Sequence, residues 1–357
     1  MRWSERSAPG NWRKAGSTNV RPVANLRRIT FACACTAVLI SCGHGGATGA
    51  SPAPAIATTA SAAAAEASPQ IPPSDKAPPA SQTGGFDGAQ AYDYVAKLVS
   101  FGPRPPATDA IHRTQDYIRT QLKSFGCPVE EDAFHSQTPI GDVEMRNLVV
   151  KIPGTGPGII VLLTHYDTAR NIDNFVGADD AGSSTGVMLE IARLLCKEKQ
   201  GSNAVWIAFL DGEEAQVTWS ASDSVYGSRE LAARMAVAGE LKRIRALILA
   251  DMVGQYNLQI PRESQSTKWL NDLIWNTAAR LGYANVFVSQ EEGVDDDHGP
   301  FLSRGVPSAD IIEYGGYVKL GYWHTSKDTL DKVSPRSIAI VGHVILASVA
   351  DLQQKFR

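Results

Sequence analysis

Three uninterrupted apolar runs constrain the fold of this chain most strongly. They read IIVLLT, VWIAFL and ALILA, they lie between residues 159 and 250, and helical patterns separate them. A strand that is apolar throughout has to be buried on both faces, so such strands belong to a sheet that is covered on each side. We therefore expect an α/β fold, with a single domain whose central sheet is mixed, mostly parallel and covered by helices on both faces.

Apolar residues at helical spacing predict the covering helices. They are expected near residues 89–100, 110–126, 183–199, 226–239, 267–281 and 335–356. Further extended segments are expected at 146–154 and 309–314. Strands that alternate with helices in this way are typical of a parallel sheet.

The amino-terminal segment has a different character. Residues 1–28 carry seven basic side chains against one acidic side chain, and the apolar run ITFACACTAVLISC follows. About a dozen apolar residues after a basic segment predict a secretory signal, because a membrane span needs roughly 20. The end of the run, LISC, resembles the bacterial lipobox. We expect residues 1–42 to be a signal peptide with cleavage before a lipidated Cys42; a plain signal peptide or an uncleaved anchor is the alternative.

Residues 43–85 consist mainly of Ala, Pro, Ser, Gly and Thr. Such a segment has too little apolar surface to offset its ordering entropy, so we expect a disordered tether. Residues 86–357 then remain as the catalytic domain. Together these segments predict an exported protein of the bacterial cell envelope, whose only contact with the membrane is the lipid anchor.

Charge and cysteine content narrow the class further. The net charge is −3 although the first 28 residues are strongly basic, so the remaining chain is acidic and a poor match for nucleic acid. Of the five cysteines, only Cys127 and Cys196 fall within the expected domain, which allows at most one disulfide. We expect a monomer.

Acidic residues and a histidine follow the apolar runs. Ligands of parallel sheets bind at the carboxyl ends of the strands, and zinc takes imidazole nitrogens and carboxylate oxygens. The candidate ligands in these places and further along the chain are His165, Asp180, Glu214, Asp251 and His324. A divalent cation at Glu214 would stabilise two adjacent carboxylates that otherwise repel each other, and would leave Glu213 free to transfer protons.

Five motifs in succession carry a family resemblance. HYD, GADDAG, DGEE, ADMVG and WHTSKDTLD resemble the co-catalytic zinc aminopeptidase superfamily. DGEEAQVTWSASDSVYGSR, DDHGPFLSRGVPSADII and FGPRPP are similar to its glutaminyl cyclase branch. The similarity extends over essentially all of residues 86–357.

The resemblance to the cyclase branch implies a role for each matching residue. One zinc ion would be held by Asp180, Glu214 and His324. Glu213 would act as general base and acid, supported by a carboxylate network in which Asp251 and Asp296 share a proton. The implied substrate pocket contains Trp219, Trp323, Asp295 and Ile312. Asp295 stands where animal cyclases have an amide side chain, and the segment between residues 307 and 323 is longer than in those enzymes and lacks their matching aromatic residue.

The implied reaction is the cyclisation of an N-terminal glutamine of a peptide or protein to pyroglutamate, with release of ammonia. The first alternative is a two-zinc aminopeptidase, in which His165 and Asp251 would hold a second ion. The second alternative is a non-catalytic envelope lipoprotein that binds peptides. Trp219 and the segment after it favour the cyclase, because a peptidase does not need them.

Overall fold

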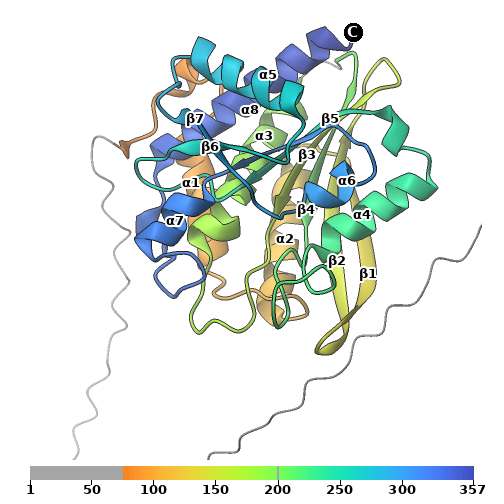
Figure 1. The fold of residues 1–357 in the computed structure, drawn as a ribbon, viewed down its shortest axis with the longest axis vertical. Coiled ribbons are helices and arrows are strands. Elements are labelled where there is room, and N and C mark those ends of the chain that lie inside the picture. Colours follow the sequence, from red (N-terminus) through yellow and green to blue (C-terminus); the bar gives the residue numbers. More distant parts are fainter. Residues whose placement is uncertain (1–74, 199–200) are drawn as a thin grey trace, which may run out of the picture. The chain divides into compact units, whose positions relative to one another are not determined.

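The computed structural model describes residues 75–198 and 201–357 (Figure 1). The predicted signal peptide, the lipobox and most of the predicted tether lie outside the described residues. The folded domain begins before the boundary predicted at residue 86, because Ala80–Gln82 form a 3-10 helix (η2). Thr83 is buried behind it, and its hydroxyl donates to the carbonyl of Phe86 at 2.6 Å.

The predicted apolar runs form the centre of a six-stranded sheet. The strands lie in the order β1-β2-β4-β3-β5-β8, and the pairings among β4, β3, β5 and β8 are parallel, whereas β1 and β2 join antiparallel. Every residue of β3 and β4 is buried, as expected for strands covered on both faces. The mixed, mostly parallel sheet is therefore confirmed. The strands are β1 (Val129–Thr138), β2 (Gly141–Ile152), β3 (Ile159–His165), β4 (Ala204–Leu210), β5 (Ile244–Asp251) and β8 (Ser308–Ile312).

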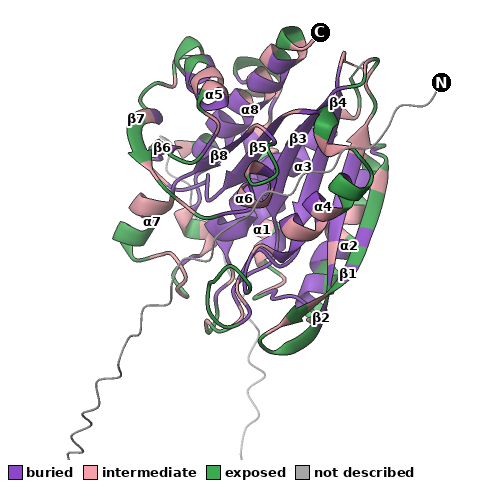
Figure 2. Cartoon of the chain, turned by 45° about the vertical axis from the view of Figure 1, so that its right-hand side comes forward, coloured by how far each residue is buried: buried purple, intermediate pink, exposed green. Residues whose placement is uncertain are grey.

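Helices cover both faces of this sheet, and successive residues of β3 point to opposite faces. Ile160 and Leu162 belong to a large apolar cluster with α1, α2, α3, α5 and α8, whereas Val161 and Leu163 pack in a second cluster with α4 and α6. Figure 2 shows the buried sheet between these layers. The helices are α1 (Gly88–Val99), α2 (Asp109–Ser124), α3 (Ser184–Leu195), α4 (Tyr226–Val237), α5 (Lys268–Arg280), α6 (Gly299–Leu302) and α8 (Pro335–Lys355).

Several elements were not predicted. They are the strand β1, the two-stranded parallel sheet of β6 (Ile260–Glu263) and β7 (Phe287–Glu292), and the helices α6 and α7 (Tyr314–Leu320). In β1 the buried positions include the polar Asp132 as well as the apolar Phe134. Buried and exposed residues alternate along this strand, but apolar and polar residues do not, so the sequence does not reveal it. Asp132 is satisfied there by the side chains of Asn147 and Arg234.

A disulfide joins Cys127 to Cys196, the pair that the cysteine count left available. It connects the segment after α2 to the end of α3 and closes a loop with a sequence separation of 69. Replacing both cysteines by serine should lower the free energy of unfolding by roughly 4 kcal/mol, because the denatured chain regains the entropy of the open loop. Urea denaturation of the oxidised protein and the double variant measures the difference, and equal midpoints would contradict the expectation.

Candidate active site

The predicted ligands converge at the carboxyl ends of the central strands. His165 is the last residue of β3 and Asp251 the last residue of β5, and Glu214 follows β4. Asp180 lies in the helical turn Ala178–Ser183 before α3, and His324 follows α7. These positions lie at one edge of the sheet because β3, β4 and β5 are parallel.

The structure brings Asp180, Glu214 and His324 together. Each offers one ligand atom, and the three atoms lie within 4.8 Å of one another. The Nε2 atom of His324 is 3.1 Å from Oε1 of Glu214 and 3.5 Å from Oδ2 of Asp180. Both carboxylates are buried, so this group fits a catalytic zinc site with one imidazole and two carboxylate donors.

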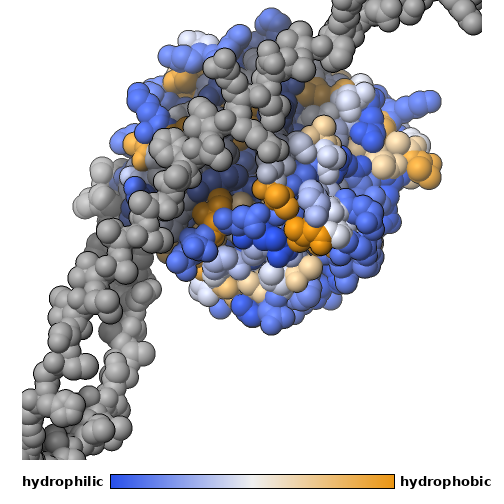
Figure 3. Space-filling view, turned by 60° about the horizontal axis from the view of Figure 1, so that its bottom comes forward, coloured by the Kyte–Doolittle hydropathy of each residue, from blue (hydrophilic) through white to orange (hydrophobic). Residues whose placement is uncertain are grey.

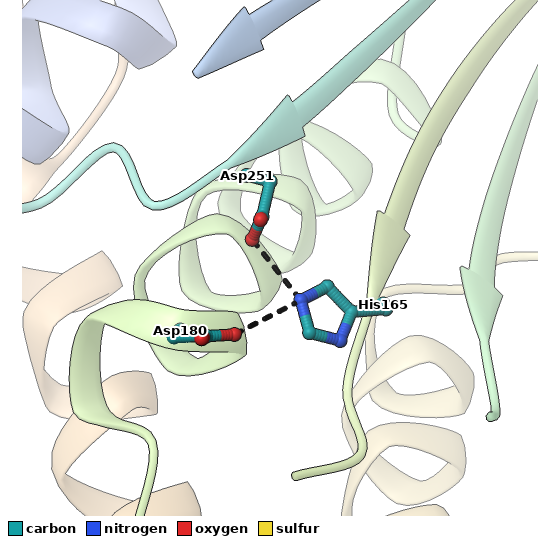
Figure 4. A group of neighbouring side chains, drawn as sticks. All are labelled: His165, Asp180 and Asp251. Carbon is teal, nitrogen blue, oxygen red and sulfur yellow. Dashed lines mark hydrogen bonds and ion pairs between the residues drawn. The ribbon is translucent and has the colours of Figure 1, made fainter. Parts of the chain in front are cut away.

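A second group shares Asp180 with the first (Figure 4). The Nε2 atom of His165 lies 3.1 Å from Oδ1 of Asp251 and 3.4 Å from Oδ1 of Asp180. All three residues are buried. The site therefore has donor atoms for one divalent ion or for two that are bridged by Asp180.

Glu213 is buried beside both groups but belongs to neither. Its Oε2 atom lies 3.8 Å from Nδ1 of His165. Burial raises the pKa of Glu213 well above its usual range; the charge of His165 opposes this increase and that of Glu214 adds to it. A buried carboxyl group with a raised pKa is suited to accept and return a proton.

The Glu213–Glu214 pair is held in place through its backbone. The two amide groups donate to the two oxygens of Asp167, at 3.1 and 3.3 Å. Gly212 precedes the pair with φ +71°, and a Cβ atom there would approach the sulfur of Met145 to 2.5 Å. Only glycine satisfies both conditions, which explains the glycine of the DGEE motif.

The electrostatics of the cluster favour a cation. Burial raises the pKa values of Glu214 and Asp251, and the negative charge of Asp180 adds to this increase for both residues. Burial opposes the charged form of His324, yet its hydrogen bond with Glu214 raises its pKa to about 9. A divalent ion would add positive charge that stabilises the ionised form of these buried carboxylates.

The proton that Asp251 and Asp296 are expected to share stays a prediction. Oδ1 of Asp251 accepts the amide of Met252 at 2.8 Å and lies against His165, whereas Oδ1 of Asp296 accepts the amide of Asp297 at 2.5 Å. Oδ2 of Asp296 is buried and has no hydrogen-bond partner among the described residues. The two carboxylates interact through charge, because burial and then the negative charge of Asp251 raise the pKa of Asp296 to about 7.

A cavity of about 520 Å³ opens onto the ligand groups. Its walls include all four predicted pocket residues, Trp219, Trp323, Asp295 and Ile312. Tyr314 also lines it and contacts the edge of Trp323, with ring centres 5.1 Å apart. The pocket wall that seemed to lack an aromatic residue is therefore formed by α7, whose place in space the sequence did not reveal. The loops after β3 and β4 lie at the lower end of the molecule in the view of Figure 1. Figure 3 brings this lower end forward and shows apolar patches among hydrophilic residues on it.

Asp223 fixes the loop that carries Trp219. Its carboxylate accepts the backbone amides of Gln216, Val217 and Thr218 at 2.8 to 3.0 Å, and the hydroxyl of Tyr226 at 2.8 Å. In the sequence, this DSVYGSR segment is only a mark of resemblance. The structure gives it a positioning role at the pocket wall.

Arg104, from the FGPRPP motif, is fully buried behind the ligands. Its guanidinium donates to the backbone carbonyls of Tyr166, Val176 and Gly177 at 2.5 to 2.9 Å. From the opposite direction, the carboxylate of Asp328 accepts the amides of Asp179 and Asp180 at 2.8 and 3.1 Å. The ligand loop, residues 176–180, is thus fixed by the buried guanidinium of Arg104 at its carbonyl groups and by the buried carboxylate of Asp328 at its amide groups.

Replacing Arg104 by methionine should therefore lower zinc affinity roughly 10- to 100-fold, as is typical when a group that orients a ligand is lost. It should also lower the free energy of unfolding by roughly 3–5 kcal/mol, because three carbonyls and Asp328 lose their buried cation. Arg104→Lys keeps the charge and should lose less. Metal titration and urea denaturation test both effects, and unchanged zinc affinity in the methionine variant would contradict the positioning role.

The mixed, mostly parallel sheet carries two buried donor groups beyond its central strands, and this donor set fits an enzyme with a divalent metal ion. Residues 147–349 match Peptidase family M28, and the chain belongs to this family. Glutaminyl-peptide cyclotransferase of Boiga irregularis is 30% identical over 286 residues, which cover 70% of this chain and 77% of that protein. Within the family the chain belongs to the glutaminyl cyclase branch, as its motifs predicted.

Solved structures agree with this assignment. The glutaminyl cyclase of an Acidobacteriales bacterium has a TM-score of 0.71 and 38% sequence identity, and the match covers 81% of this chain and all of that one (100%). A Zn-dependent exopeptidase from Parabacteroides distasonis has a TM-score of 0.67 and 30% identity, with 73% of this chain and 97% of that chain covered. Relatives with this fold are therefore named both as glutaminyl cyclases and as Zn-dependent exopeptidases.

Proposed function

We propose that this protein is a zinc-dependent glutaminyl-peptide cyclotransferase, an acyltransferase that converts the N-terminal glutamine of peptides or proteins to pyroglutamate. The observation that carries the proposal is the position and protonation behaviour of Glu213. It is a buried carboxyl group with a raised pKa, it stands outside both ligand groups, and it lines the same cavity as Trp219 and Trp323.

We assign the zinc ion to Asp180, Glu214 and His324. The support for zinc is the donor set itself, together with membership of family M28 and a structural neighbour named as a Zn-dependent exopeptidase. When bound there, the ion would supply Lewis-acid polarisation of the γ-carbonyl of the substrate glutamine.

The residues of the chain move the protons. The substrate α-amine forms a C–N bond with the carbonyl carbon (Cδ) of its own side-chain amide, and Glu213 accepts the proton that this nitrogen loses. The bond to the γ-amide nitrogen breaks, and Glu213 returns the proton to that nitrogen, which leaves as ammonia. Because the attack is intramolecular, the pocket mainly has to fold the glutamine side chain back, and the rings of Trp219 and Trp323 keep out water that would hydrolyse the amide.

One observation favours a second candidate, the two-zinc aminopeptidase. His165, Asp180 and Asp251 form a second complete donor group beside the first. The Trp219 loop, which Asp223 fixes through its backbone amides, favours the cyclase because it places Trp219 in the cavity wall, a feature that a peptidase does not need.

A paired assay tests the proposal. The purified protein, loaded with zinc, is incubated with a glutamine-initiated peptide and separately with a chromogenic amino-acid amide. Cyclisation releases ammonia and lowers the peptide mass by one ammonia molecule, whereas a peptidase releases the chromophore and adds water. Release of the chromophore without ammonia would overturn the proposal, and activity on neither substrate would favour the peptide-binding lipoprotein.

We also propose that the protein is exported and anchored in the cell envelope. The disulfide between Cys127 and Cys196 supports an oxidising compartment. Cell fractionation tests the anchor, because Cys42→Ala should move the protein from the membrane fraction to the soluble fraction.

A further inference from the structure

Arg170 is an unusual side chain in the wall of the cavity. The cavity is otherwise rich in acid, and among its described lining residues Arg170 is the one arginine or lysine. The acids are Asp180, Glu213, Glu214, Asp251, Asp295 and Asp296. Arg170 is half-buried, yet within residues 75–198 and 201–357 it forms no ion pair with a carboxylate.

The arginine is held in a fixed position. Its Nε atom donates to Oε1 of Gln216 at 2.9 Å, and Nη2 donates to the carbonyl of Pro106. Gln216 is itself fixed, because its side-chain amide donates to the carbonyl of Glu214 at 3.2 Å and its backbone amide to Asp223 at 2.8 Å. The guanidinium is thus tied to the loop that carries one of the assigned ligands.

One nitrogen of the guanidinium is left over. Among the described residues Nη1 of Arg170 has no hydrogen-bond partner, although the side chain lines the cavity. A half-buried guanidinium with an unused donor favours a carboxylate, which it binds by charge-assisted hydrogen bonds. The distribution of charge along the pocket is therefore uneven, with buried acids around the donor groups and a fixed cation on the wall.

We propose that Arg170 selects substrates that carry a carboxylate close to the N-terminal glutamine. This inference rests on the proposed function and specifies its substrate class. The α-amine of such a substrate faces the acids beside Glu213, and the carboxylate binds Arg170. The carboxylate belongs to the C-terminus of a very short peptide or to an acidic side chain at the second residue.

Matched substrates measure this preference. The pairs are Gln-Ala, Gln-Ala-Ala and a longer glutamine peptide, each as the free acid and as the C-terminal amide. We expect the acid to exceed the amide roughly tenfold in kcat/KM at one of the two short lengths, the effect of one charge-assisted hydrogen bond. The ratio should approach one for the longer peptide. Gln-Glu-amide compared with Gln-Gln-amide shows whether a side-chain carboxylate serves equally well.

Three variants assign the preference to the residue. Arg170→Met should reduce the ratio of acid to amide to about one, and Arg170→Lys should keep part of it because the charge remains. Arg304→Met is the matched control, since Arg304 also donates to a proline carbonyl, that of Pro300, but does not line the cavity. A ratio near one for the wild-type protein at every length together with equal kcat/KM for Gln-Glu-amide and Gln-Gln-amide, or a preference that is unchanged in Arg170→Met, would overturn the inference.

A binding measurement separates this inference from the proposed function. Calorimetric titration of the zinc-loaded Glu213→Gln variant with Gln-Ala and Gln-Ala-amide reports the same preference without turnover. Tighter binding of the acid, lost when Arg170→Met is added, supports the carboxylate site even if no cyclisation is observed. Equal binding of acid and amide contradicts it even if the protein is an active cyclase.

Discussion

Glu213→Gln should lower kcat for a glutamine-initiated peptide roughly a hundred- to ten-thousand-fold, the range for loss of a general acid–base group, while zinc content stays unchanged. Glutamine preserves the size of the side chain and its place beside His165, but it cannot accept the α-amine proton. Glu213 belongs to neither donor group, so its loss should not release the ion.

The neighbouring glutamate provides the matched control. Glu214→Gln changes the same atoms one position along the chain, at a residue that lies 3.1 Å from His324 within the assigned zinc site. We expect this variant to lose zinc as well as activity. Stopped assays measure activity and elemental analysis measures zinc content in both variants. If Glu213→Gln lost zinc and Glu214→Gln retained it, the roles of proton carrier and zinc ligand would be exchanged between the two glutamates.

Removal of zinc with a chelator should abolish turnover, and added Zn²⁺ should restore it, because the acyl centre would lose its Lewis acid. Two histidines then distinguish one ion from two. His324→Asn should abolish activity and empty the assigned site. His165→Asn should leave the bound zinc unchanged in a one-ion enzyme and remove an equivalent in a two-ion enzyme.

The outcome of the His165 variant decides between the two candidate functions. Elemental analysis of the wild-type protein and of His165→Asn gives the number of ions directly. Two equivalents in the wild type, falling to one in the variant, would support the aminopeptidase. A wild-type protein that remains fully active after complete removal of metal would contradict zinc dependence altogether.

The part of the site that could be predicted is the part that strand burial determines. β3 and β4 are buried along their whole length and β5 at every position except Arg245, so each strand contains a long apolar run and its carboxyl end is easily located. Polar residues directly after such strands have to lie at one edge of a parallel sheet. This is why His165, Glu214 and Asp251 could be brought together from the sequence alone.

The remaining part depends on contacts between segments that are distant in the chain. Tyr314 reaches the pocket only because α7 packs beside Trp323, and Arg104 reaches the ligand loop from the segment before α2. Asp251 and Asp296 also come from distant segments; their Oδ1 atoms accept backbone amides, Oδ2 of Asp296 has no hydrogen-bond partner among the described residues, and the shared proton stays a prediction. Local patterns do not report which partner a polar group takes.

The separation of the donors along the chain has a consequence for how the protein responds to heat. Glu214 and His324 lie 110 positions apart, and Asp180 belongs to yet another segment, so the chelating group is complete only when these three segments are folded together. Binding an ion then acts on the native state alone and adds RT ln(1 + [Zn²⁺]/Kd) to its stability. The melting temperature should rise steadily as free zinc is buffered upward, which turns a simple thermal scan into a measurement of metal affinity.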